Sequence, residues 1–239
     1  MMDKAALPGG LARWTCGMLV VFALVTVATE AAGWHRYQVL RALPLKRSDE
    51  DGALVRADMW FGNLTGWLQA VFLVTMLLFI LWLDSMRSFA DAVWPQGQRR
   101  HRAWVFFGWL IPLGQLFIPK MFINDLWAAA QPETRRRRGS PLLTVWWLVV
   151  LAAGCWATLD YSAPKQAATA GEARQALRKV MLSDGLHIAA AALTIAVVWR
   201  LSSVLHRAVA GGRHQAPAKS NSGGPAVSLA YPIKTTRDG

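Results

Sequence analysis

The sequence predicts an all-α integral membrane protein with four transmembrane helices. Hydrophobic residues make up 54% of the 239-residue chain and charged residues only 17%, a balance that soluble domains seldom have. The apolar residues lie in long uncharged runs, of which 59–83 and 139–159 are the clearest. At about 1.5 Å per residue, each run is long enough to cross a hydrocarbon core of roughly 30 Å.

The formal net charge of +12 has a simple explanation in such a protein. Lysine and arginine collect on the cytoplasmic side of membrane proteins, so a basic chain is expected without any nucleic acid. No zinc ligands, RNA-binding aromatic platform or helix-turn-helix pattern accompanies the charge. Nucleic acid is therefore not expected as a partner. Cys16 and Cys155 lie in apolar runs and are expected to be small buried hydrophobic residues.

The first span is expected at about 14–34, where Trp14 and Trp34 are placed as interfacial anchors. A cleaved signal peptide is the alternative, since basic residues precede the apolar run and small residues follow it. A retained helix is favoured because the apolar character continues beyond Glu30. Residues 1–13 are then a cytoplasmic N-terminus.

The second span is expected at about 60–83, with its helix continuing into the cytoplasm and ending near Pro95. The third is expected at 141–160, where a Ser-Pro pair provides a helix start. The next segment, "EARQALRKVMLSDG", is typical of a separate short amphipathic helix at the outer interface.

The fourth span is expected at about 184–205, with Ser183 or Asp184 as its N-cap and Arg200 reaching out to the interface. The membrane domain therefore covers 14–210. Residues 211–239 are rich in Gly, Pro, Ser and basic residues and predict a disordered basic tail.

Between the second and third spans, residues 103–128 predict a bent element on the cytoplasmic side. The uncharged run 103–119 barely reaches the length of a span, and Pro112 removes a helix hydrogen bond near its middle. If this element does not cross, most of the 26 lysines and arginines share one side with both termini, which assigns that side to the cytoplasm. A five-span arrangement gives a smaller charge difference and remains an alternative.

The bent element also carries a motif, "WLIPLGQLFIPKMFINDLW". It resembles the membrane family catalogued as domain of unknown function 4328, whose hallmark is a tryptophan, two prolines, an intervening amide and a closing Leu-Trp pair. The resemblance covers roughly 60–207 and implies an integral membrane protein, mostly of high-GC Gram-positive bacteria, without established activity or known catalytic residues. Glutamine stands here where the family usually has asparagine. The matching positions are Trp109, Pro112, Gln115, Pro119, Leu126 and Trp127.

No catalytic or cofactor-binding motif accompanies these features, and no metal site or cofactor is expected. Asp184 and His187 are three residues apart, so a membrane hydrolase is one alternative, although a helix cap is the stronger explanation for Asp184. A small transporter or channel-like protein using the broken segment 109–127 is another. The favoured expectation is a non-enzymatic membrane scaffold or interaction protein of the plasma membrane.

The partners expected from the sequence are the lipid bilayer and proteins that the sequence does not identify. Four consecutive arginines, Arg135, Arg136, Arg137 and Arg138, directly precede the third span. They are expected either to determine topology or to contact anionic lipid headgroups.

Overall fold

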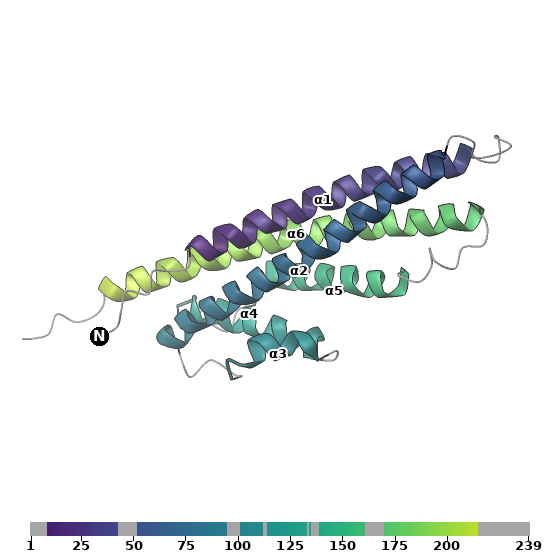
Figure 1. Ribbon diagram of the computed structural model, residues 1–239. Helices are drawn as coiled ribbons and strands as arrows, with labels where there is room; N and C mark the ends of the chain where they lie inside the picture. The colour runs from purple at the N-terminus through teal and green to yellow at the C-terminus, as the bar shows by residue number, and fades with distance from the viewer. Residues whose placement is uncertain are drawn as a thin grey trace, which may run out of the picture.

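The computed structural model describes residues 9–42, 52–94, 101–111, 114–132, 134, 139–160 and 170–214, and its regular elements within these ranges are all helical. The long helices are α1 (Gly9–Ala42), α2 (Ala53–Val93), α5 (Pro141–Asp160) and α6 (Ala170–His214). The short ones are α3 (Trp104–Leu110), the 3₁₀ turn η3 (Gly114–Leu116) and α4 (Ile118–Ala129). Helices α1, α2 and α6 run side by side, α5 lies along α6, and α3 and α4 gather beside the C-terminal half of α2 (Figure 1).

Helices α1 and α2 pack antiparallel through small hydroxyl side chains. The Thr15 hydroxyl lies 2.9 Å from the Leu11 carbonyl oxygen of its own helix and 3.3 Å from the Leu78 carbonyl oxygen of α2. The Thr75 hydroxyl makes the reciprocal approach, 3.4 Å from the Met18 carbonyl oxygen of α1. Small hydroxyl residues allow membrane helices to approach closely and to hydrogen-bond across the contact.

Helix α6 is joined to its neighbours by hydrogen bonds from aromatic side chains. The Trp146 indole of α5 donates to the Thr194 hydroxyl at 2.9 Å, and the Trp82 indole of α2 donates to the Ser202 hydroxyl at 3.2 Å. Each buried indole N–H thereby has an acceptor, which a tryptophan in an apolar core requires. These bonds connect α2, α5 and α6 around one core.

The main core lies where α2, α4, α5 and α6 meet. Its largest fully buried side chains are Trp82, Trp146, Phe122, Leu83 and Met86. A second, smaller cluster joins α1 to α6 through Leu19, Phe22 and Ala191.

Among the described residues, three helices are long and apolar enough to cross a membrane: the stretches Gly9–Ala42, Ala53–Asp91 and Arg178–Arg207. A shorter apolar helix covers Pro141–Trp156. Only 11% of the most apolar window of α2 is buried inside the protein, and its exposed side carries large apolar residues such as Trp67 and Leu73. A surface of this kind is stable in lipid and unstable in water, so the fold is that of a multi-pass membrane protein.

The sequence-based boundaries need correction at α6. The predicted separate amphipathic helix is wrong, because α6 is continuous from Ala170 to His214. Ser183 and Asp184 are buried inside this helix and do not cap it. Helix α6 extends to His214, and the rest of the predicted tail, residues 215–239, lies outside the described residues.

Helices α1 and α2 also extend beyond the predicted spans. Helix α1 covers 34 residues and α2 covers 41, so α2 is roughly 60 Å long and must project beyond a hydrocarbon core of about 30 Å. Helix α2 ends at Val93, next to the stop predicted near Pro95.

Candidate functional site

The candidate site is the folded-back segment formed by α3, η3 and α4, which we call the α3–α4 element, together with the bundle surface that it contacts. A close approach between α3 and α4 fixes its bend. A Cβ atom at Gly108 would lie 2.5 Å from the Ile118 Cγ2 atom and 3.1 Å from its Cβ atom. Glycine is therefore required sterically at position 108.

The turn of this element is tied to α5. The Trp147 indole donates a hydrogen bond to the Leu116 carbonyl oxygen at 3.1 Å, and Trp147 itself belongs to the main core. The Gln115 backbone N–H donates to the Ile111 carbonyl oxygen at 2.8 Å, which closes the turn internally. Broken backbone near a membrane is stable when protein covers its polar groups, and these bonds provide part of that cover.

Helix α4 then enters the bundle. Pro119 lies in its first turn, where the missing N–H does no harm. One face of α4 is buried in the main core through Phe122, Ile123 and Leu126. The element therefore packs as an integral part of the bundle.

The other side of the element is exposed and apolar. Phe107 is 57% exposed and Phe117 is 66% exposed. Aromatic side chains in this position are typical of a segment that lies in the interfacial region of a bilayer.

The motif residues have different environments. Trp109 meets the Phe79 ring of α2 edge-on, with the ring centroids 6.0 Å apart, and Leu126 is fully buried. Trp127 is partly buried and lies under the Arg200 guanidinium of α6, 5.8 Å from ring centroid to Cζ. Gln115 is exposed at the turn.

Two of the predicted site features lie outside the described residues. They are Pro112 and the arginine run Arg135 to Arg138.

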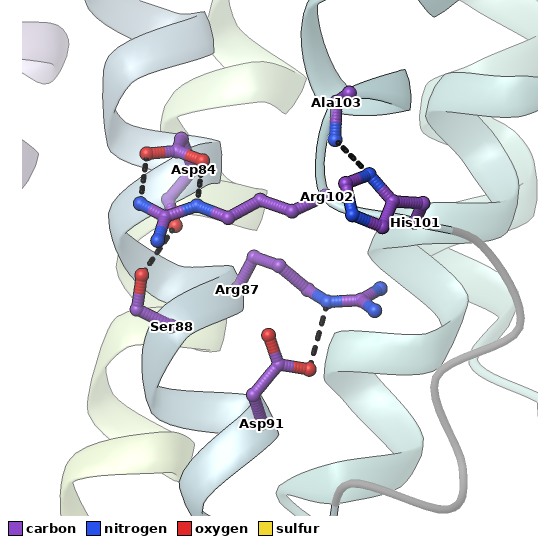
Figure 2. A network of polar contacts seen from close by, with 7 residues as sticks. All are labelled: Asp84, Arg87, Ser88, Asp91, His101, Arg102 and Ala103. Carbon is purple, nitrogen blue, oxygen red and sulfur yellow. Dashed lines mark hydrogen bonds and ion pairs between the residues drawn. The ribbon is translucent and has the colours of Figure 1, made fainter.

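A polar network holds the start of the element against the end of α2. The Arg102 guanidinium donates two hydrogen bonds to the Asp84 carboxylate, at 2.6 and 2.5 Å (Figure 2). The hydrogen bond to Asp84 raises the pKa of Arg102 above its ordinary value, so the arginine stays charged. One turn further along α2, Arg87 Nε donates to the Asp91 carboxylate at 3.1 Å (Figure 2).

Arg87 is a buried charge, only 4% exposed, and its guanidinium lies over the Phe122 ring of α4, 5.3 Å from the centroid. Asp125, one turn beyond Phe122, is also buried at 5% exposure. Two charged residues on facing helices are thus withdrawn from water at the base of the α3–α4 element. Burial of this kind is costly without good partners, and it defines how the two helices must meet.

A second set of polar residues lies between α1 and α6, within their apolar stretches. Asp184 is 8% exposed, and Glu30 of α1 is close enough for the two carboxyl groups to interact electrostatically. His187 Nδ1 is 2.9 Å from the Ser183 carbonyl oxygen and its ring meets Phe22 edge-on. The imidazole is therefore bonded to its own helix backbone, and among the described residues no hydrogen bond joins it to Asp184. Within the described ranges, no group of three or more His, Cys, Asp or Glu could hold a metal ion.

Hollows on the described part of the molecule are shallow. One, of about 290 Å³, is lined by Arg56, Met59, Trp60 and Asn63 at the start of α2. Another, of about 460 Å³, lies between the end of α4 and the C-terminal part of α6 and includes Trp127, Gln131, Arg200 and Arg207. Neither contains Asp184 or His187, the two residues that the sequence suggested for catalytic chemistry.

Sequence reasoning missed the Asp84–Arg102 pair and the contact of Arg200 with Trp127. Both bring together residues that are far apart in the chain. Arg200 directly follows the uncharged run 185–199, and a charge at that position is the signal that could have identified its contact.

The family comparison agrees with the motif. A family model described as "Domain of unknown function (DUF4328)" matches residues 46–203 of the chain. No curated protein and no solved structure matches it.

Proposed function

The chain belongs to the family described as domain of unknown function 4328, and we propose that it is a non-enzymatic scaffold or interaction protein of the plasma membrane. In this proposal it has four spans, its termini are cytoplasmic, and the α3–α4 element is a rigid platform at the cytoplasmic surface. Its protein partners are unidentified.

The length of α5 supports a fourth span. The helix has 20 residues, equivalent to roughly 30 Å, which matches the thickness of a hydrocarbon core. Its Thr144 hydroxyl is contacted by the Lys120 ammonium of α4 at 3.4 Å, so the start of α5 lies level with the α3–α4 element. A single crossing by α5 then brings the start of α6 to the opposite side.

The distribution of charge supports the orientation. The network of Asp84, Arg87 and Arg102 lies at the C-terminal part of α2, and the sequence between α2 and α3 is basic. The four arginines before α5 follow on the same side if the element does not cross. Such clustering of positive charge is typical of cytoplasmic loops.

The observation that carries the proposal is the packing of the α3–α4 element. Its inner face is buried in the main core, its turn is bonded to Trp147, and its outer face exposes aromatic side chains. A transporter or hydrolase needs a cavity where polar groups converge, whereas a binding platform needs a rigid exposed surface. In the described part of the chain, a rigid exposed surface is better developed than a polar cavity.

The proposal can be tested by placing a photo-crosslinking amino acid at Asn124, which is exposed on α4, and at Leu182, which is exposed on α6 outside the element. We expect discrete crosslinked proteins from position 124 in cells, and we expect Gly108→Ala to abolish them because it displaces the element. Crosslinks from position 182 are the matched control and should survive Gly108→Ala.

Absence of crosslinks at position 124, or crosslinks that Gly108→Ala leaves unchanged, would contradict a platform role. Strong thermal stabilisation of the purified protein by a small solute would favour a transporter instead.

A further inference from the structure

A groove lies between the end of α4 and the C-terminal part of α6. Its walls are two short stripes of residues at helical spacing. Arg200, Val204 and Arg207 are on one face of α6, and Trp127 and Gln131 are on one face at the end of α4. Ala130 and Pro132 complete the lining.

The groove carries positive charge from two arginines of α6, Arg200 and Arg207. Arg200 and Arg207 are both exposed, and none of the ion pairs among described residues includes either guanidinium. Arg207 Nε donates to the Ser203 carbonyl oxygen at 3.3 Å, which holds the side chain along α6. An arginine has five N–H donors, so both side chains keep donors for an incoming anion.

The groove also lies near the C-terminal end of a helix that is long and apolar enough to span a membrane. Arg200 and Arg207 are near the C-terminal end of the apolar stretch of α6, and the neighbouring Trp199 is 73% exposed. An exposed tryptophan next to an arginine at the end of a span is typical of the membrane interface, where arginine extends toward phosphate groups.

From this combination we infer that the groove binds the headgroup of an anionic phospholipid. The lipid phosphate would accept hydrogen bonds from Arg200 and Arg207, and the Gln131 amide would contact the uncharged part of the headgroup. The acyl chains would lie along the exposed apolar surface of α6.

The same geometry predicts selectivity against zwitterionic headgroups. A choline or ethanolamine cation would be brought close to two guanidinium groups, which costs free energy through repulsion of like charges. The Trp127 ring, which could otherwise attract a quaternary ammonium, already has the Arg200 guanidinium over it. A headgroup with a phosphodiester and no cation, such as phosphatidylglycerol, fits the groove best.

This inference rests on the membrane placement proposed above but needs neither a protein partner nor a scaffold role. It can therefore fail or succeed independently of the crosslinking experiment.

The test is native mass spectrometry of the full-length protein in detergent, titrated with phosphatidylglycerol or phosphatidylcholine. We expect preferential binding of phosphatidylglycerol, weakened about fivefold by Arg200→Gln or Arg207→Gln and about thirtyfold by both, since each charge near a lipid phosphate contributes roughly that factor. Arg200→Lys/Arg207→Lys should keep most of the preference because it keeps both charges.

The matched control is Arg13→Gln/Arg41→Gln, which removes two exposed arginines of α1 that do not line the groove. We expect it to bind phosphatidylglycerol like the unaltered protein. If the control variant lost as much affinity for phosphatidylglycerol as the groove variants, net charge alone would explain the loss. The inference would then be overturned. Equal binding of the two lipids by the unaltered protein would overturn it as well.

In a second part of the experiment, inorganic phosphate is added at constant ionic strength to the protein with bound phosphatidylglycerol. No displacement of phosphatidylglycerol is expected, because a free phosphate lacks the acyl chains. Displacement at millimolar phosphate would make the groove a site for a soluble anion and contradict the lipid assignment.

Discussion

Gly108→Ala is the substitution whose effect follows most directly from the geometry. The new Cβ atom would be 2.5 Å from the Ile118 Cγ2 atom, well inside van der Waals contact. Rotation of the Ile118 side chain cannot remove the conflict completely, because its Cβ atom would still be 3.1 Å away. The two short helices of the α3–α4 element must therefore move apart.

The change in the free energy of unfolding of Gly108→Ala can be compared with that of a matched control variant. Crowding of this kind in a packed core costs about 1–3 kcal/mol, while replacing a helical glycine by alanine gains about 0.5–1 kcal/mol. Gly154 of α5 has no atom within 4 Å of an added Cβ, so Gly154→Ala should show only the gain. The free energy of unfolding of Gly108→Ala should accordingly be about 1–3 kcal/mol below that of Gly154→Ala.

The assay is unfolding in mixed micelles by SDS titration, followed by tryptophan fluorescence. A double variant, Gly108→Ala/Ile118→Ala, should lose less stability than the sum of its two single variants, because Ile118→Ala removes the clashing Cγ2 atom. Equal stability of Gly108→Ala and Gly154→Ala, or strictly additive effects in the double variant, would refute the close approach of α3 and α4.

Further predictions concern the contacts that hold the α3–α4 element and α6 in place. Trp147→Phe should lower the free energy of unfolding by about 1 kcal/mol because the Leu116 carbonyl loses its donor, whereas Trp156→Phe, at an exposed site on α5, should have little effect in the same SDS titration. Trp146→Phe should cost about 0.6–2 kcal/mol through loss of the bond to Thr194, and Thr194→Val should give no further loss in that background if the bond is responsible. Asp84→Asn should cost less than about 1 kcal/mol, because Arg102 is more than half exposed, but should increase proteolysis near residue 102, and unchanged cleavage would argue against a tether.

The long apolar helices could be predicted from the sequence because their signal is local. Uncharged runs identify α1, α2 and the membrane part of α6, and the Ser-Pro pair marks the start of α5 at Pro141. The end of α2 near Pro95 follows in the same way from the restriction that proline places on the preceding residues.

The continuity of α6 was not predicted because local cap signals were overridden by packing. Ser183 and Asp184 are good N-cap residues, but both are buried where α6 runs along α1. Before them, the Arg178 guanidinium donates to the Tyr37 hydroxyl of α1 at 2.7 Å, so the polar part of α6 is already packed on the bundle. A helix supported in this way has no reason to end.

The same distinction between local features and contacts across the fold applies to the candidate site. The bend between α3 and α4 is indicated by two prolines and a glycine, which are local features. The contact of Arg200 with Trp127 and the bonds from Arg102 to Asp84 connect residues on different elements, so only the three-dimensional arrangement reveals them. The groove between α4 and α6, which includes Arg200 and Trp127, had no signature in the linear sequence.

The most direct test of the central claim is cysteine accessibility in intact cells, because the account depends on four spans and on an α3–α4 element that does not cross. Single reporter cysteines would replace Ser48, Ser162, Arg137 and Ser228 in a background with Cys16→Ala and Cys155→Ala. The account predicts that a membrane-impermeant thiol reagent labels positions 48 and 162 and reaches 137 and 228 only after the membrane is opened. Labelling of positions 137 and 228 from opposite sides, or of 137 and 162 from the same side, would contradict it.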